Sequence, residues 1–231
     1  MARLDRDSVS GAACSLDVPA IETRGLRFAY PGAGAPVLEG LDWHVPQGAF
    51  ALLVGGTGSG KSTLLSLLKP EIAPAGERAG ELRVLGESVA GMDVRASAER
   101  VGYVFQDPEN QIVCETVWHE MAFGLEDWLH RDTDTLSGGR KQLLSLAAVL
   151  ALRPRVLLLD EPTKGLDLAS RRIIARALRD HAQAGGTVIM ATHDLDFAEQ
   201  VSDDIAMMFD GEIACMEPPA DFFADNVFYR A

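Results

Sequence analysis

The feature that most constrains the fold is a glycine-rich run at residues 55–63, which reads GGTGSGKST and fits the pattern G-x-x-x-x-G-K-[ST]. The apolar run Phe50–Val54 precedes it, and leucines at helical spacing follow it from Leu64 onward. Glycines allow a backbone nest whose N–H groups face an anion, and the N-terminus of the next helix adds its positive end. A strand, a glycine loop and a helix in this order predict a phosphate-binding loop. The alternative is a glycine-rich turn with a chance lysine, which the agreement of strand, loop and helix disfavours.

Length, charge and cysteine content narrow the class of protein. The chain has 231 residues, enough for a large domain with a real core, and a formal net charge of −13. That charge argues against a nucleic-acid partner, which needs a basic face. No apolar run is long enough to cross a bilayer, and residues 1–20 are expected to be a flexible leader and not a signal peptide. Cys14, Cys114 and Cys215 are far apart, which fits a reducing cytosol and indicates neither a disulfide framework nor a metal site.

Two kinds of strand pattern occur along the chain. Short candidate strands at 25–30, 41–45 and 80–85 predict a small antiparallel layer. Other apolar runs are separated by helical stretches, which predicts βα units and a parallel sheet buried on both faces. These runs are Phe50–Val54, Val101–Phe105, Val156–Leu159 and Val188–Ala191.

Polar or glycine residues follow each of these four apolar runs. They are Gly55, Gln106, Asp160 with Glu161, and His193. In open α/β sheets, ligands bind beyond the carboxyl ends of the strands, so we expect these groups to converge on one edge of the sheet.

The residue types at this edge suit phosphate chemistry. Lys61 can reach the β- and γ-phosphates of a nucleotide, and the Ser62 hydroxyl can ligate Mg²⁺. Asp160 and Glu161 should point to opposite faces, because successive strand side chains alternate. Asp160 is the natural partner of the Mg²⁺ shell, and Glu161 could accept a proton from an attacking water. The alternative is a solvated acidic turn before Pro162.

A second glycine motif, Leu136-Ser137-Gly138-Gly139, precedes the helical run Leu143 to Leu152. Ser137 suits an N-cap, and the helix start offers free N–H groups. Alone this predicts only a capped helix. Its place between the phosphate loop and the Asp160, Glu161 and His193 elements strengthens a functional interpretation.

The order of these motifs resembles the nucleotide-binding subunit of ATP-binding cassette (ABC) transporters over residues 22–223. LSGG at 136–139 matches the signature of that family, and ATHD at 191–194 matches its switch histidine. GLD at 165–167 matches the loop that crosses the dimer interface, and FAYP at 28–31 matches its adenine-stacking aromatic. The alternative for Tyr30 is a strand-end tyrosine in a turn.

The resemblance implies an α/β fold of the P-loop NTPase (RecA-like) type. It has a mostly parallel sheet core, an antiparallel β layer and a shortened helical subdomain. We expect one domain at 21–231, with the helical insert at about 107–150.

The resemblance also assigns roles to residues of this chain. ATP is expected at Tyr30, Val37, Gly55, Gly56, Thr57, Gly58, Ser59, Gly60, Lys61, Ser62 and Thr63. Mg²⁺ is expected at Ser62, Gln106 and Asp160, and catalysis at Lys61, Gln106, Glu161 and His193. The residues expected to contact ATP held by an opposite cassette are Ser137, Gly138 and Gly139. Asp167 is expected at the dimer interface. The implied partners are transmembrane transporter subunits and a second cassette, identical or different, at the cytoplasmic face of the membrane.

A narrower resemblance lies after Gln106. The runs VFQDPENQIV at 104–113 and AFGLE at 122–126 are similar to energy-coupling-factor transporters and their cobalt or nickel relatives. Such proteins import vitamins or transition-metal ions, and a separate membrane protein chooses the substrate. The stretch at 127–135 is shorter than the helical arm of that family, which leaves the coupling to the membrane partner open.

Three other classes remain as alternatives. An ABC ATPase without a transport role usually has paired cassettes, coiled-coil insertions or basic surfaces, and none of these is evident here. A regulatory cassette that has lost hydrolysis is disfavoured because the recognisable catalytic positions are filled. A P-loop kinase has no place for the Ser137 motif or for the ordered Asp160, Glu161 and His193 elements.

Overall fold

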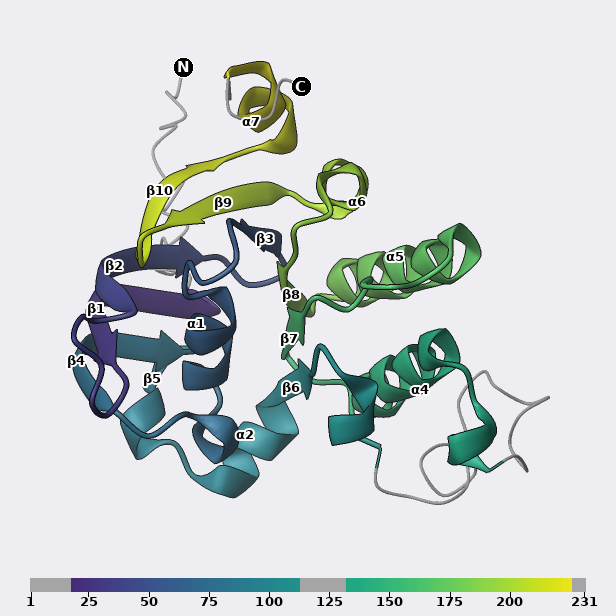
Figure 1. The fold of residues 1–231 in the computed structure, drawn as a ribbon, viewed down its shortest axis with the longest axis horizontal. Helices are drawn as coiled ribbons and strands as arrows, with labels where there is room; N and C mark the ends of the chain where they lie inside the picture. The colour runs from purple at the N-terminus through teal and green to yellow at the C-terminus, as the bar shows by residue number, and fades with distance from the viewer. Residues whose placement is uncertain (1–17, 113–131, 226–231) are drawn as a thin grey trace, which may run out of the picture.

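The computed structural model describes residues 18–112 and 132–225, which form two sheets and the helices around them (Figure 1). The larger sheet has six strands in the order β10-β9-β3-β8-β7-β6. Its strands are β3 (Phe50–Val54), β6 (Val101–Val104), β7 (Val156–Asp160), β8 (Thr187–Ala191), β9 (Asp204–Phe209) and β10 (Glu212–Glu217). Neighbouring strands from β9 to β6 are parallel, and β10 pairs with β9 in the antiparallel direction.

The smaller sheet is antiparallel throughout, in the order β2-β1-β4-β5. Its strands are β1 (Ile21–Ala29), β2 (Leu38–Val45), β4 (Glu77–Val84) and β5 (Glu87–Ser88). The predicted parallel core and antiparallel layer are therefore both confirmed. The predicted strands correspond to β1, β2, β4, β3, β6, β7 and β8, but β1 begins four residues earlier than predicted, and β2 and β4 begin three residues earlier.

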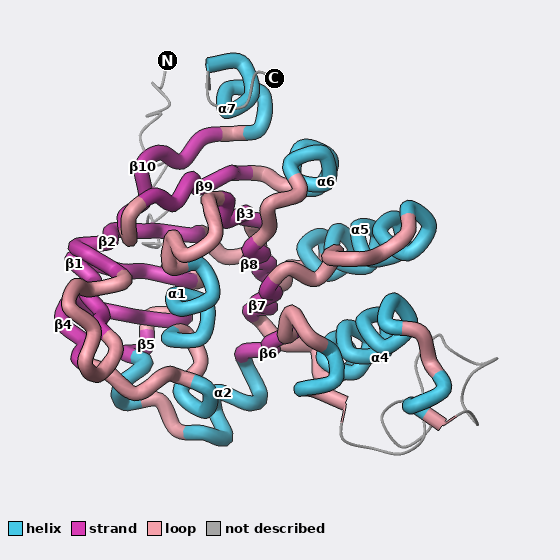
Figure 2. Tube along the Cα trace, in the orientation of Figure 1, coloured by secondary structure: helices cyan, strands magenta, loops and turns pink. Residues whose placement is uncertain are grey.

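The α-helices lie on both faces of the larger sheet (Figure 2). They are α1 (Lys61–Leu67), α2 (Val94–Arg100), α4 (Gly138–Ala151), α5 (Leu168–Gln183), α6 (Leu195–Val201) and α7 (Pro219–Asp225). Single 3₁₀ turns occur at Pro70–Ile72, Val89–Gly91, Pro108–Asn110 and Thr133–Thr135. No described helix is both long enough and apolar enough to span a membrane.

Alternation along the strands divides the core into two layers. On β7, Leu158 packs in the cluster with α1 and the antiparallel sheet, whereas Leu157 and Leu159 pack in the cluster with α4, α5 and α6. Burial on both faces explains why these strands are near-continuous apolar runs. As a result α1 and α4 lie on opposite faces of the sheet, which separates the two glycine motifs within one chain.

The division into a leader and one domain stays a prediction. Residues 1–17 lie outside the described residues, and so do residues 113–131 of the helical insert predicted at about 107–150. The described part of that insert contributes the turn at Pro108–Asn110, the turn at Thr133–Thr135 and helix α4.

Candidate functional site

Two glycines of the phosphate loop are required, Gly55 by close packing against β9 and Gly60 by its left-handed backbone. A Cβ atom added at Gly55 would lie 2.3 Å from the carbonyl oxygen of Met208. At Gly60, where φ is +104°, it would meet side-chain atoms of Leu38 and Met208 at 2.8 and 2.9 Å. The two ends of the loop therefore lie close to Leu38 and Met208, and Thr57 lies exposed between them.

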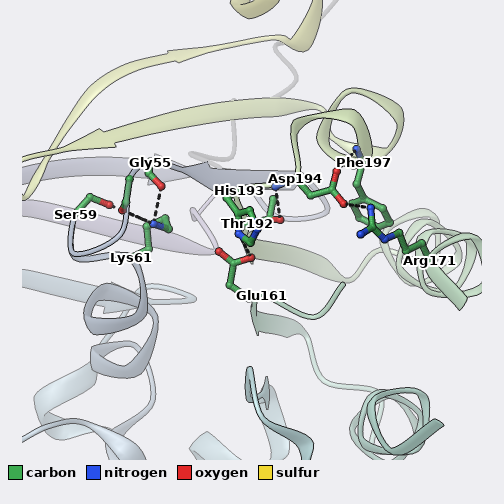
Figure 3. A network of polar contacts seen from close by, with 10 residues as sticks. Gly55, Ser59, Lys61, Glu161, Arg171, Thr192, His193, Asp194 and Phe197 are labelled. Carbon is green, nitrogen blue, oxygen red and sulfur yellow. Dashed lines mark hydrogen bonds and ion pairs between the residues drawn. The ribbon is translucent and has the colours of Figure 1, made fainter. Parts of the chain in front are cut away.

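Lys61 begins α1 and turns its side chain back into the loop (Figure 3). Its Nζ donates to the carbonyl oxygens of Gly55 and Gly56 at 2.8 Å each and lies 3.4 Å from Ser59 Oγ. Burial lowers the pKa of Lys61, while the charges of Glu161 and Asp160 raise it. The buried Lys61 ammonium therefore lies among the carbonyl groups of the loop and near the charges of Glu161 and Asp160, where a phosphate-binding loop places its cation.

A pocket of about 290 Å³ opens beside this loop. It is lined by Tyr30, Val37, Gly58, Gly60, Lys61, Ser62 and Thr63. The Tyr30 ring packs edge-on against the Phe28 ring, with the two ring centroids 5.0 Å apart. The Tyr30 hydroxyl lies 3.0 Å from Thr63 Oγ1. The structure thus brings both predicted adenine contacts to the same hollow as the phosphate loop.

Asp160 ends β7 and is buried, with its Oδ1 lacking a hydrogen-bond partner among the described residues. Burial raises the pKa of Asp160, and the nearby Ser62 hydroxyl acts in the opposite direction. These oxygen donors fit Mg²⁺, which usually takes one or two carboxylates and completes its shell with phosphate and water. Within residues 18–112 and 132–225, no cluster of three acidic, histidine or cysteine side chains could hold a metal by itself.

Glu161 lies one residue beyond Asp160 but in different surroundings. Its backbone is left-handed, with φ +48°, and its N–H donates to the carbonyl of Ala191 at 2.9 Å. Its Oε2 is 2.8 Å from Nδ1 of His193 (Figure 3). A non-glycine residue in this conformation costs about 1–3 kcal/mol and is often associated with function. The loops that leave β7 and β8 therefore meet through this carboxylate–imidazole pair.

Gln106 lies exposed just beyond β6, the strand next to β7. Two amide side chains that the sequence did not single out hold the start of its loop. Gln111 Oε1 accepts from the N–H of Phe105, and Gln111 Nε2 donates to the carbonyl of Tyr103, both at 3.2 Å. Gln142 Nε2 donates to the Phe105 carbonyl at 3.4 Å. Gln111 lies in the run VFQDPENQIV at 104–113, but no sequence pattern assigns it or Gln142 a contact, so only the fold exposes this role.

The second glycine motif begins α4, as the sequence predicts. Ser137 is the N-cap, but its exposed side chain makes no cap hydrogen bond, so the first N–H groups of the helix have no partner from it. Gly139 packs close to Leu166, and neighbouring Asp167 caps α5 by accepting from Ser170 N at 2.7 Å. That hydrogen bond lowers the pKa of Asp167. Ser137, Gly138 and Gly139 are not brought to Lys61 within one chain, because α4 covers the other face of the sheet.

The model of a known protein family matches residues 38–164, and its description is ABC transporter. This chain belongs to that family. It is 37% identical over 216 residues to a Bacillus cereus ABC transporter ATP-binding protein, a match that covers 83% of this chain and 39% of that protein. It is also 37% identical to the nickel import ATP-binding protein NikO of Rhodobacter capsulatus, over 92% of this chain and 94% of the relative. ATP-binding proteins of energy-coupling factor transporters are among the similar chains as well.

A solved structure supports the same conclusion on the fold. It is cbiO1 from Clostridium perfringens, described as part of the ABC transporter complex cbiONQ, with a TM-score of 0.77 and 27% identity. The match covers 90% of this chain and 92% of that structure. The chain spans about two fifths of the length of several longer ABC relatives. The predicted family and the predicted narrower group are both confirmed.

Proposed function

We propose that this chain binds ATP and hydrolyses its β–γ bond to drive a membrane transporter. The observation that carries the proposal is the convergence of Lys61, Asp160 and the Glu161–His193 pair beyond the carboxyl ends of β3, β7 and β8. Phosphoryl transfer needs positioning and charge stabilisation more than covalent help, and this edge offers both.

Each residue takes a role that its surroundings support. The Lys61 ammonium draws charge from the β- and γ-phosphate oxygens, and the backbone nest holds them. Glu161 orients the attacking water and accepts its proton, while His193 contacts the γ-phosphate. Tyr30 and Val37 line the pocket in which the adenine would lie.

A magnesium ion fits the oxygen donors Ser62, Asp160 and Gln106. When bound, it would neutralise charge on the β- and γ-phosphates. The buried Oδ1 of Asp160, which lacks a partner among the described residues, supports this assignment. The chain's own contribution is to hold Asp160 at the end of β7, an interior strand of the sheet.

A second cassette completes the site. Because Ser137, Gly138 and Gly139 lie away from Lys61 in one chain, we propose that they contact ATP bound to the partner, with Asp167 at the interface. ATP would then favour the closed dimer and ADP would not. A shift from mostly open to mostly closed needs about 5 kcal/mol of differential affinity. Several charge-assisted hydrogen bonds at about 1.5–3 kcal/mol each suffice.

The transport role is supported by the relatives. NikO is named for nickel import, and cbiO1 is part of a transporter complex, so we propose uptake of a transition-metal ion or a vitamin. The partners would be transmembrane subunits, and the chain would lie peripherally at the cytoplasmic face of the membrane. Recovery of the tagged chain only from the aqueous fraction, and never with detergent-solubilised membrane protein, would favour an ABC ATPase without a transport role.

The hydrolysis itself is tested by phosphate release from ATP and by calorimetry of ATP binding. Lys61→Ala should lose ATP affinity and turnover together, because the loop loses its cation. Unchanged ATP binding in that variant would contradict the assignment of the phosphate loop. A wild-type chain that binds ATP but releases no phosphate would favour a regulatory cassette.

A further inference from the structure

An arginine on α5 lies between two loops of the candidate site (Figure 3). Arg171 Nε donates to the carbonyl of Leu166 at 3.2 Å, in the loop that ends at Asp167. Its NH1 pairs with Asp194 Oδ2 at 2.5 Å, in the loop that carries His193. One planar guanidinium therefore joins the segment after β7 to the segment after β8.

Asp194 makes hydrogen bonds through both carboxylate oxygens and through its backbone N–H. Its Oδ1 accepts from the N–H of Phe197 at 3.2 Å, in the first turn of α6. Its own N–H donates to Thr192 Oγ1 at 3.0 Å, and Thr192 is fully buried. His193 lies between Thr192 and Asp194 in the chain, so the position of Asp194 determines where the backbone places the His193 imidazole.

These contacts close a ring. From Glu161 the chain makes a tight turn to Leu166, in which Lys164 N donates to the Glu161 carbonyl at 3.2 Å. Arg171 then bonds to both Leu166 and Asp194. His193, the neighbour of Asp194, lies with its Nδ1 2.8 Å from Glu161 Oε2 and completes the ring. The His193 side chain is 67% exposed, so packing alone does not hold it against Glu161.

We infer that Arg171 is a positioning residue that keeps His193 in register with Glu161 by tying the two loops together. The inference rests on the proposed function for its consequence, because the ring contains the proposed base and the γ-phosphate contact. The guanidinium acts through Asp194, since its described hydrogen bonds go to Leu166 and Asp194. A lysine offers a point charge in place of a fork, so it can keep the pair with Asp194 but not both contacts with the same geometry.

The kinetic test compares Arg171→Ala and Arg171→Lys with a matched control, Arg172→Ala. Arg172 is the next residue of α5, is exposed and carries the same charge. Arg171→Ala should lower kcat for ATP about tenfold or more with KM changed by about twofold or less, because an interaction in the transition state is lost. Arg171→Lys should lie between that variant and the wild type, and Arg172→Ala should match the wild type.

A second background separates positioning from general stabilisation. If Arg171 acts through His193, then adding Arg171→Ala to His193→Ala should cause no further loss of turnover. The same fold loss in both backgrounds would overturn the inference and leave a purely structural role. If the wild type hydrolyses ATP and Arg171→Ala has the same turnover, the inference is overturned but the proposed function is not. If the wild type does not hydrolyse ATP, the proposed function is overturned.

A spectroscopic measurement tests the geometry without hydrolysis. The ¹H–¹³C imidazole resonance of His193 can be assigned by its disappearance in His193→Ala. Arg171→Ala and Asp194→Asn should move that resonance in the same direction, and Arg172→Ala should leave it in place. An unmoved resonance in a folded Arg171→Ala chain would overturn the inference whether or not ATP is hydrolysed. Thermal unfolding confirms folding, and Arg171→Lys replaces the alanine variant if that variant does not fold.

Discussion

Glu161 combines a left-handed backbone with a carboxylate that pairs with an imidazole. Glu161→Gln keeps the size and can still hydrogen-bond His193, but it cannot accept a proton from water. Turnover should therefore fall by about 10²-fold or more, in line with general-base contributions, while ATP affinity stays near that of the wild type. Phosphate release and calorimetry check the two parts separately. Near-normal turnover in Glu161→Gln would show that Glu161 does not accept the proton of the attacking water.

The two adjacent glycines of the loop allow a matched test of packing. Gly55→Ala forces a Cβ against the Met208 backbone, which cannot move without displacing β9, whereas an added Cβ at Gly56 meets open space. Overpacking of this kind costs about 1–3 kcal/mol, and a change in open space stays within about 0.5 kcal/mol. Denaturant unfolding without nucleotide should show that difference. Equal free energies of unfolding in the two variants would contradict the packing argument.

How far the sequence predicts the site depends on where each residue stands relative to a strand. Lys61, Asp160 and His193 could be placed together because each follows an apolar run, and parallel strands end at one edge. Gln111, Gln142 and the contacts of Arg171 could not, because they join segments that local patterns do not relate. The roles assigned to the predicted site residues stay predictions.

At the level of elements, the predicted strands of the larger sheet are the ones buried on both faces, including the edge strand β6. Strands β3, β6, β7 and β8 are buried on both faces, so each is a continuous apolar run. The β9–β10 hairpin was not predicted, because β10 alternates exposed and half-buried residues and gives a weak hydrophobic signal. The Asp210-Gly211 turn between them, with φ of +46° and +83°, is the signal that could have revealed it.

The edge strand β6 leads to a prediction about the Gln106 loop. Gln111→Ala removes two neutral hydrogen bonds to β6 and the residue after it, at about 0.5–1.5 kcal/mol each. The loop should loosen, so the Mg²⁺ concentration needed for half-maximal ATP hydrolysis should rise if Gln106 is a metal ligand.

The control for this loop is Asn110→Ala, which alters an exposed neighbour whose described hydrogen bond is made by the backbone. Magnesium titrations of the hydrolysis rate compare the two variants. Wild-type magnesium dependence in Gln111→Ala would show that the amide does not position the loop for metal binding.

For the whole molecule, the decisive fact is that the two glycine motifs lie on opposite faces of one sheet. A single chain cannot bring the start of α4 to its own phosphate loop without breaking the core between them. The sequence supplied both motifs and their order, and their separation in space supports the proposal that a second cassette contributes the Ser137 motif.

Ser137→Arg tests the association of two cassettes. A bulky cation at the exposed N-cap of α4 opposes the positive end of the helix and blocks the approach of a partner's phosphate. In the Glu161→Gln background, where slow hydrolysis should retain ATP, light scattering should show a dimer with ATP and a monomer without it. Adding Ser137→Arg should abolish the ATP-dependent dimer while calorimetry still shows ATP binding, because Lys61 and its loop lie on the other face. A dimer that persists with Ser137→Arg would reject the shared site, and loss of ATP binding along with the dimer would show that the two motifs are not independent within the chain.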